Sequence, residues 1–290
     1  ADIEQWRQSP ESSAPVPDGV LVRHIAGSPG APNVRIFIFG KSPGGHHRPG
    51  LLYMHGGGYI SGSTASSWPG FSGLQKIARD HDCTVVSVDY RLAPETPFPG
   101  ALEDNYAALK WLHVNAESLG VDPARIAVMG ESAGGGHAAT LTLAARDRGE
   151  IPILFQLLIY PMLDDRTGST RRVPTHIGEF IWTRQHNRFG WSSLLGVPAG
   201  SKMVPKGSVP ARASNLRGLP PTYIGVGSVD LFVEEDIELA KRLIEAGVST
   251  ELSVAPGAYH GFFFLSPNAT VSKEFAASFN AALARGFERT

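Results

Sequence analysis

The stretch Gly130-Glu131-Ser132-Ala133-Gly134-Gly135 lies between a short apolar run, Arg125–Met129, and a segment rich in helix-forming residues, Ala133–Arg148. A sharp turn from strand to helix needs strained backbone angles and close approach of chain to chain, which the glycines of this G-x-S-x-G pattern permit. Ser132 would then project its Oγ above the sheet edge, at a helix N-terminus that favours developing negative charge. The alternative, a glycine-rich helix start with an N-cap serine, is disfavoured by the strand before it. The stretch therefore predicts a nucleophilic serine.

Strand-like and helical segments alternate on both sides of this stretch. The predicted strands are Val20–Ile25, Val34–Phe39, Leu51–Met54, Thr84–Tyr90, Arg125–Met129, Ile153–Tyr160, Thr222–Val226 and Glu251–Ala255. The predicted helices are the segment where leucines recur from Leu102 to Leu112, Ala133–Arg148, a segment between acidic Glu234 and Gly247, and residues from about Val271 to Arg285. Asp122-Pro123 is expected to form a turn. This alternation predicts an α/β fold whose mostly parallel central sheet carries helices on both faces.

One stretch breaks the alternation. Residues from about 164 to 219 contain Trp182, Trp191 and several prolines, but no strand-like run. We expect this stretch, together with residues from about 1 to 19, to form a helical cap over the sheet rather than an independent domain. Residues 1–290 are accordingly predicted to be a single domain.

The composition excludes several other classes of protein. Lys and Arg number 26 and Asp and Glu number 27, a formal net charge of −1, so no basic face for nucleic acid is expected. The 33 glycines and 22 prolines make the chain rich in turns without reaching the low-complexity range. The single cysteine, Cys83, has no partner for an internal disulfide and is predicted to be a buried, inert thiol.

Targeting and metal-binding signals are weak. No apolar run approaches the roughly 18 residues of a membrane-spanning helix. The first residues lack a charged-then-apolar signal pattern, which favours a cytoplasmic protein, although a cleaved leader would leave no trace. The pair His46-His47 lies in a Gly/Pro-rich loop with no third ligand nearby, so we predict no metal site.

A second motif, His55-Gly56-Gly57-Gly58-Tyr59, directly follows a predicted strand. Three consecutive glycines leave backbone N–H groups unobstructed and able to point at a ligand. Acyl transfer needs such donors where a carbonyl oxygen becomes an oxyanion, and an HGGG loop supplies them in combination with a G-x-S-x-G elbow. A triple glycine alone would more often be a flexible loop. Its pairing with the elbow favours an oxyanion loop in which His55 is structural.

A serine nucleophile needs a base and an orienting acid, in the chain order serine, acid, histidine for a strand–turn–helix elbow of this kind. Of the ten histidines, His260 is the one that follows the last predicted strand, on a loop. Asp230 follows the strand Thr222–Val226. The rival acids, residues 234–236, already suit the first turn of a helix. Ser132, Asp230 and His260 are therefore the predicted triad.

These motifs together resemble the hormone-sensitive-lipase-like family of α/β-hydrolases. The matching segments are His55–Gly58, Asp89–Glu95, Phe98–Asp104, Gly130–Gly135, Asp230 and His260–Phe262, within residues from about 34 to 285. The resemblance implies an α/β-hydrolase fold, hydrolysis of short- to medium-chain carboxylic esters, and no cofactor. It implies oxyanion donors from the backbone amides of Gly57, Gly58 and Ala133. A homodimer is a weaker expectation from the same resemblance.

The chain departs from the family pattern in two places. Glu131 stands where many relatives carry aspartate, a change that would affect the pocket wall. Only 54 residues precede His55, fewer than the family usually has there. A smaller N-terminal part of the cap would leave the acyl or alcohol side of the pocket unusually open.

Aromatic residues near the motifs are candidate pocket walls, though the same residues could form the core of the cap. The candidate substrate-binding residues are Tyr59, Glu131, Phe180, Trp182, Phe189 and Phe262. The same triad could serve an amidase, peptidase or acyltransferase, because the motifs do not set the leaving group or the acceptor. A non-catalytic receptor on the same fold is disfavoured because no triad member is missing.

Overall fold

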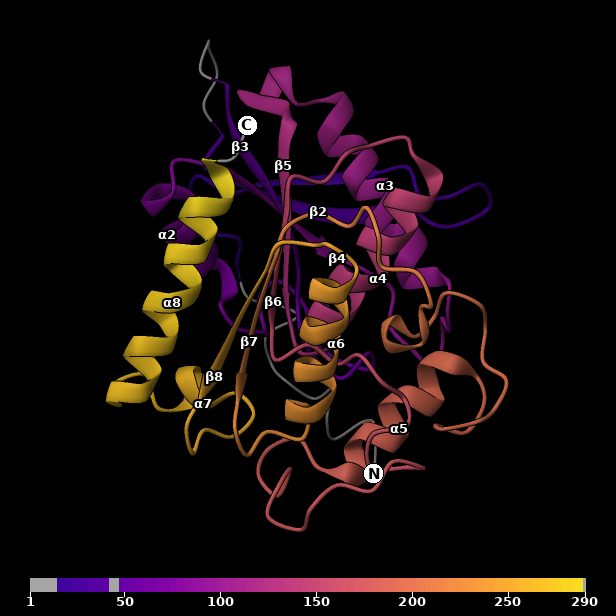
Figure 1. The fold of residues 1–290 in the computed structure, drawn as a ribbon. Coiled ribbons are helices and arrows are strands. Elements are labelled where there is room, and N and C mark those ends of the chain that lie inside the picture. Colours follow the sequence, from indigo (N-terminus) through magenta and orange to yellow (C-terminus); the bar gives the residue numbers. More distant parts are fainter. Residues whose placement is uncertain (1–14, 42–46, 289–290) are drawn as a thin grey trace.

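A computed structural model describes residues 15–41 and 47–288, which form an eight-stranded sheet in the order β1-β2-β4-β3-β5-β6-β7-β8 (Figure 1). The strands are β1 Leu21–Ile25, β2 Val34–Phe39, β3 Arg48–Met54, β4 Thr84–Asp89, β5 Val121–Glu131, β6 Phe155–Ile159, β7 Thr222–Gly227 and β8 Thr250–Ala255. Strand β2 pairs antiparallel with β1 and β4, and the remaining pairs are parallel. The predicted mostly parallel sheet is confirmed, and the carboxyl ends of β3 to β8 share one edge.

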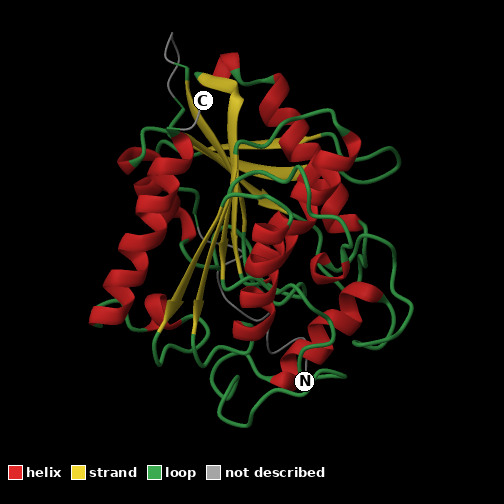
Figure 2. Cartoon of the chain, viewed as in Figure 1, coloured by secondary structure: helices red, strands yellow, loops and turns green. Residues whose placement is uncertain are grey.

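Helices cover both faces of this sheet (Figure 2). The helices are α2 Gly70–Asp80, α3 Gly100–Val114, α4 Ala133–Arg148, α5 Arg184–Leu195, α6 Val233–Glu245, α7 Phe262–Leu265 and α8 Thr270–Phe287, with 3₁₀ turns at Glu117–Leu119 and Pro210–Arg212. Alternate strand residues feed two cores: Leu52 and Met54 of β3 pack on the side of α3, α4 and α6, and Leu51 and Tyr53 on the side of α2 and α8. Burial of both faces explains why the inner strands are nearly continuous apolar runs, whereas the edge strands β1 and β8 carry exposed polar residues.

Two local details differ from the sequence-based expectation. The expected turn at Asp122-Pro123 lies within β5, where the register is irregular: Arg48 pairs with Val121 but Gly50 pairs with Ile126. Asp122 still makes the local hydrogen bond typical of a turn, because its Oδ1 accepts the Ala124 N–H at 2.9 Å. Helix α2 is not among the predicted helices, because it is short and its first residues are the helix-breaking pair Pro69, at the N-cap, and Gly70.

The cap lies between β6 and β7 at the carboxyl edge of the sheet, with α5 as its main helix (Figure 1). Thr183 starts α5 with a capping box in which its side chain accepts from the His186 N–H. Apart from an isolated bridge between Thr167 and Arg171, the described part of the cap has no strand. Of the expected N-terminal contribution, residues 1–14 lie outside the described residues, as does His46.

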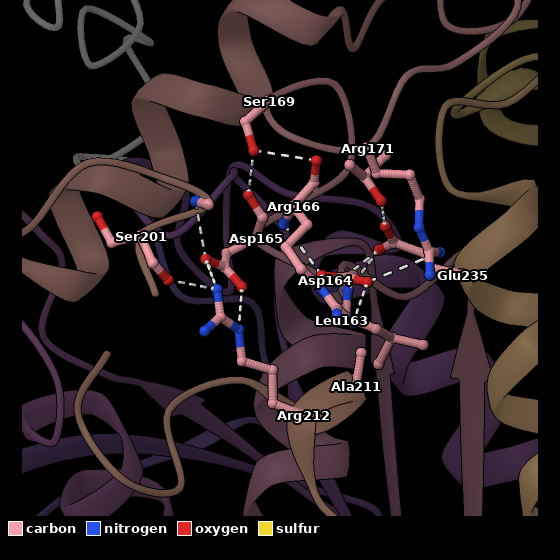
Figure 3. A network of polar contacts seen from close by, with 12 residues as sticks. Leu163, Asp164, Asp165, Arg166, Ser169, Arg171, Ser201, Ala211, Arg212 and Glu235 are labelled. Carbon is pink, nitrogen blue, oxygen red and sulfur yellow. Dashed lines mark hydrogen bonds and ion pairs between the residues drawn. The ribbon is translucent and has the colours of Figure 1, made fainter. Parts of the chain in front are cut away.

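A network of buried acids fastens the start of the cap to the rest of the molecule (Figure 3). Asp164 pairs with Arg166 at 2.8 Å, and Asp165 forms two hydrogen bonds with the guanidinium of Arg212, at 2.8 and 2.7 Å. Glu235, on α6, accepts the backbone N–H of Leu163 at 2.7 Å and that of Asp164 at 3.2 Å. Glu235 thus joins the start of the cap to α6, and removing Arg212 would leave the buried carboxylate of Asp165 uncompensated.

Two further expectations concern the whole chain. Burial raises the pKa of the Cys83 thiol to about 12, which accords with an inert thiol in the core. In the described residues, no helix combines the length and apolar character needed to cross a membrane.

Candidate active site

The predicted serine elbow is a tight turn between β5 and α4. Ser132 has φ +55° and ψ −123°, a strained conformation for a residue with a side chain. The turn is possible because its neighbours lack side chains: a Cβ on Gly134 would lie 2.1 Å from the Met54 carbonyl oxygen, and one on Gly130 would lie 2.2 Å from that of Gly134. The glycines of the motif are therefore required by contact between backbone segments.

The Ser132 backbone is held in this conformation by its neighbours. Its N–H donates to the carbonyl of Ile159, the last residue of β6, at 2.9 Å. Its own carbonyl accepts the N–H groups of Gly136 at 3.0 Å and Met162 at 2.9 Å. Three backbone hydrogen bonds thus offset the strain at the elbow.

The three residues expected to form a triad meet at the carboxyl edge of the sheet. His260 Nε2 lies 2.9 Å from Ser132 Oγ, and its Nδ1 lies 2.8 Å from Asp230 Oδ2. The other oxygen of Asp230 accepts the backbone N–H of Phe232 at 3.0 Å. With Nδ1 protonated toward the acid, Nε2 is left free to accept the serine proton. All three side chains are buried, and Ser132 is only 7% exposed.

The rival acids have other surroundings. Glu235 is engaged with the cap and Asp236 is buried within the packing of α6. Glu234 is exposed on the same helix. Of the four candidate acids, Asp230 is the one in contact with His260.

The glycine loop curls over the elbow. Gly57 and Gly58 have φ +126° and +62°, and a Cβ on Gly57 would lie 2.0 Å from the Ser61 carbonyl oxygen. His55 lies beneath the loop, stacked on Tyr90 with ring centroids 4.2 Å apart, and its backbone carbonyl accepts the Tyr90 hydroxyl. Burial lowers the pKa of His55, which suits a neutral structural ring.

Glu131 connects the elbow to the glycine loop. Its Oε1 accepts the Gly56 N–H at 2.6 Å, and its Oε2 lies in hydrogen-bond contact with the Tyr53 hydroxyl, which also lies 2.6 Å from the Trp68 carbonyl. Tyr53 has one proton for two acceptors, so both contacts are satisfied when Glu131 is protonated and donates to the phenol oxygen. Burial accordingly raises the pKa of Glu131 to about 8.

Ser132 and His260 border a cavity of about 310 Å³. Its remaining lining residues are Gly56, Gly57, Gly58, Ser61, Gly62, Ser66, Ser67, Trp68, Glu131, Tyr160, Ile181, Trp182, Gly261 and Phe264. Glu131 and Trp182 were expected here, whereas Trp68, Ile181 and Phe264 were not. A larger hollow of about 620 Å³ lies between α3, α4 and residues 204–215, and no triad residue lines it.

Four of the expected pocket residues lie elsewhere, which corrects that expectation. Tyr59 is buried against Trp191 and donates its hydroxyl to the Met162 carbonyl at 2.7 Å, because its φ of +71° turns the side chain into the cap core. Phe262 belongs to the core beneath α8. Phe180 is 60% exposed, and Phe189 packs against the apolar cluster of the cap.

Comparison with known proteins agrees with this geometry. A family model described as the alpha/beta hydrolase fold matches residues 51–264, which include the glycine loop, the elbow, Asp230 and His260. The chain belongs to the hormone-sensitive-lipase-like family of α/β-hydrolases. The resemblance read from its motifs is thereby confirmed.

Members of this family resemble the chain over most of its length. It is 33% identical over 267 residues to the carboxylesterase NlhH of Mycobacterium tuberculosis, covering 90% of this chain and 80% of NlhH. A solved structure titled bacterial heroin esterase is 41% identical with a TM-score of 0.83, covering 93% of this chain and 85% of that one. The esterase LipW of Mycobacterium marinum is 38% identical with a TM-score of 0.79, over 92% and 82% of the two chains.

Proposed function

We propose that this ester hydrolase is a serine carboxylesterase that acts on short- to medium-chain esters through an acyl-enzyme. The observation that carries the proposal is the pair of contacts made by His260, 2.9 Å to Ser132 Oγ and 2.8 Å to Asp230 Oδ2. Relatives named as carboxylesterases and esterases support ester hydrolysis as the reaction.

The first half of the reaction follows from these contacts. As Ser132 Oγ attacks the ester carbonyl carbon, its proton passes to His260 Nε2. Asp230 holds the ring in the required tautomer and stabilises the imidazolium that forms. The carbonyl oxygen becomes an oxyanion, which the N–H groups of Gly57, Gly58 and Ala133 would stabilise from the loop and the start of α4.

The second half regenerates the enzyme. The tetrahedral intermediate collapses, the C–O bond to the alcohol breaks, and His260 returns its proton to the leaving oxygen. A water molecule then gives its proton to His260 and attacks the acyl carbon, and the carboxylic acid leaves as Ser132 recovers its proton. The apolar and aromatic walls formed by Trp68, Ile181 and Trp182 suit an uncharged acyl or alcohol group.

Labelling with a serine-directed phosphonate tests the nucleophile. Wild type should incorporate one phosphonate per chain and lose activity, while Ser132→Ala should neither react nor hydrolyse 4-nitrophenyl acetate above background. Another serine at the cavity wall, Ser66, provides the control, since Ser66→Ala should label as wild type. Labelling of Ser132→Ala would overturn the assignment.

Substrate range needs separate measurements. A series of 4-nitrophenyl esters from acetate to decanoate should show highest kcat/KM among short and medium chains. A sharp loss beyond four carbons would count against an open acyl side. Matched ester and amide substrates, each with and without an added alcohol, separate an esterase from an amidase or acyltransferase. Faster amide hydrolysis or dominant ester exchange would overturn the carboxylesterase proposal.

A further inference from the structure

The indole of Trp182 lies directly on Gly58. A Cβ on Gly58 would lie 2.0 Å from Cη2 of Trp182 and within 2.9 Å of two other atoms of the same six-membered ring. Trp182 comes from the cap, is 4% exposed and lines the same cavity as Ser132. A cap residue thus contacts the backbone of the loop that would donate to the oxyanion.

A strained turn delivers Trp182 to this place. Its backbone N–H donates to the Phe180 carbonyl at 2.7 Å, and Ile181 between them has φ +62°. Turns of this three-residue kind with positive φ are rare, and a β-branched residue in this region costs about 1–2 kcal/mol. Strain of this kind persists when surrounding contacts require it, and it concentrates at functional sites.

A second cap residue, on α5, contacts the backbone of the same glycine. A Cβ on Gly190 would lie 2.5 Å from the Gly58 carbonyl oxygen, so the helix backbone approaches the loop closely. Tyr59 and Trp191, which follow Gly58 and Gly190 in the chain, are also in contact, since their ring centroids lie 5.0 Å apart. Within the loop, the Gly57 carbonyl accepts the Ile60 N–H at 3.1 Å and the Ser61 N–H and hydroxyl at 3.0 Å each. Gly58 has no side chain, and the two cap contacts add to this support from the other side.

The Trp182 ring is itself anchored through a chain of hydrogen bonds. Its Nε1 donates to Asn187 Oδ1 at 3.1 Å, and Asn187 Nδ2 donates to the Thr167 carbonyl at 2.8 Å. The Thr167 hydroxyl donates to Glu235 of α6, the acid at the centre of the network in Figure 3. Asn187 and Thr167 are both buried, so the chain is shielded from water.

We propose that Trp182 and Gly190 are positioning residues that fix the backbone of Gly58, and with it the direction of the Gly58 N–H, for oxyanion stabilisation, so the cap completes the oxyanion hole. The inference rests on the proposed esterase mechanism. Oxyanion donors act only when held 2.7–3.1 Å from the developing charge, so a small displacement of the peptide lowers transition-state binding more than substrate binding. The cap therefore controls the rate of the chemical step as well as access.

Two substitutions test this from opposite directions. Trp182→Phe replaces the indole by a smaller ring that no longer reaches Gly58. Gly190→Ala places a methyl group against the Gly58 carbonyl oxygen. For 4-nitrophenyl acetate, each should lower kcat by about tenfold or more while KM stays within about twofold. Affinity for an aryl trifluoromethyl ketone, which forms a hemiketal oxyanion on the serine, should weaken by the same factor as kcat/KM.

Matched controls separate positioning from general damage to the fold. Trp111→Phe makes the same change on α3, and Gln185→Ala changes an exposed residue of α5; both should keep wild-type kcat and ketone affinity. Melting temperatures of all variants are measured, and assays run well below the lowest. If the control variants also lose kcat, in step with a fall in their melting temperatures, the loss reflects general damage to the fold and the inference is wrong.

Two other kinetic results would also show that the inference is wrong. If Trp182→Phe and Gly190→Ala raise KM with kcat unchanged, these residues are only substrate walls and the inference is wrong. Unchanged kinetics and ketone affinity in both variants would overturn it equally. Ser132→Ala is assayed in parallel: if it is inactive while the two variants keep full kcat, the inference alone fails. If Ser132→Ala retains activity, the proposed mechanism fails, and the inference that rests on it fails too.

Discussion

The carboxyl group of Glu131 accepts the backbone N–H of Gly56 at 2.6 Å, so the residue before the elbow serine holds the first glycine of the His55–Gly58 loop. Glu131→Ala would leave this N–H without its acceptor, at a cost of about 1–3 kcal/mol. Glu131→Gln keeps an acceptor oxygen at the same reach. We expect the alanine variant to unfold at lower urea concentration and with lower kcat than the glutamine variant. Equal stability of the two would contradict a role for the hydrogen bond.

The same carboxyl should make stability depend on pH. Burial raises the pKa of Glu131 to about 8 from an ordinary 4.5, so between these values the folded chain binds the proton and the unfolded chain releases it. Its contribution is therefore present in full below about pH 4.5 and is lost as pH rises through 8, with a slope of up to about 1.4 kcal/mol per pH unit. Urea unfolding at pH 5, 6, 7 and 8 should show a smaller decline in Glu131→Gln than in wild type. Parallel curves would refute the prediction.

Asp236 should destabilise the fold at high pH for a related reason. Within the described residues neither of its carboxyl oxygens has a hydrogen-bond partner, and burial, followed by the nearby acids Glu235 and Asp230, raises its pKa. Its folded-state pKa is above the unfolded value, so stability is lost as pH rises. Asp236→Leu removes the buried carboxyl, and we expect its gain in unfolding free energy over wild type to be larger at pH 8 than at pH 5. A gain that shrinks with rising pH would show that the carboxylate is stabilised.

A pair of glycine substitutions tests the packing of the elbow. Gly134→Ala would place its methyl 2.1 Å from the Met54 carbonyl oxygen, and overpacking this severe should cost about 3 kcal/mol or more. Gly149, at the other end of α4, has φ +67°, and a methyl group there would have nothing within 4 Å, so Gly149→Ala should cost only about 1–2 kcal/mol. Urea unfolding of both variants measures the difference. Similar losses would contradict the prediction, because they would mean that close approach at Gly134 costs no more than positive φ at Gly149.

The sequence was sufficient to predict the fold and the three residues that meet at the sheet edge. Alternation of apolar runs and helical spacing located the eight strands within a few residues, and most clearly the inner ones, because strands buried on both faces must be apolar. Chain order then selected Asp230 and His260, since the loops after parallel strands β7 and β8 emerge at the same edge as the elbow. These inferences depend on local pattern and topology alone.

The cavity walls could not be predicted in this way. Ile181 reaches the cavity through an unusual turn, and Trp68 through a loop between β3 and α2, neither of which has a local sequence signature. Tyr59 lies next to the glycine loop in sequence, yet its backbone conformation directs the ring into the cap core. Side-chain direction on irregular segments depends on packing partners that are distant in the chain.

The hydrogen bonds around Ser132 define where a different cap could be grafted onto this enzyme. Ile159 accepts the Ser132 N–H and Met162 donates to the Ser132 carbonyl, so the residues that lead into the cap also support the backbone of Ser132. Leu163 continues this role, because its N–H is bound by Glu235 of α6. A chimaera joined directly after β6 would keep Ile159 but replace Met162 and Leu163, whereas a junction beyond Leu163 would keep all three and leave the hydrogen bonds of the elbow intact.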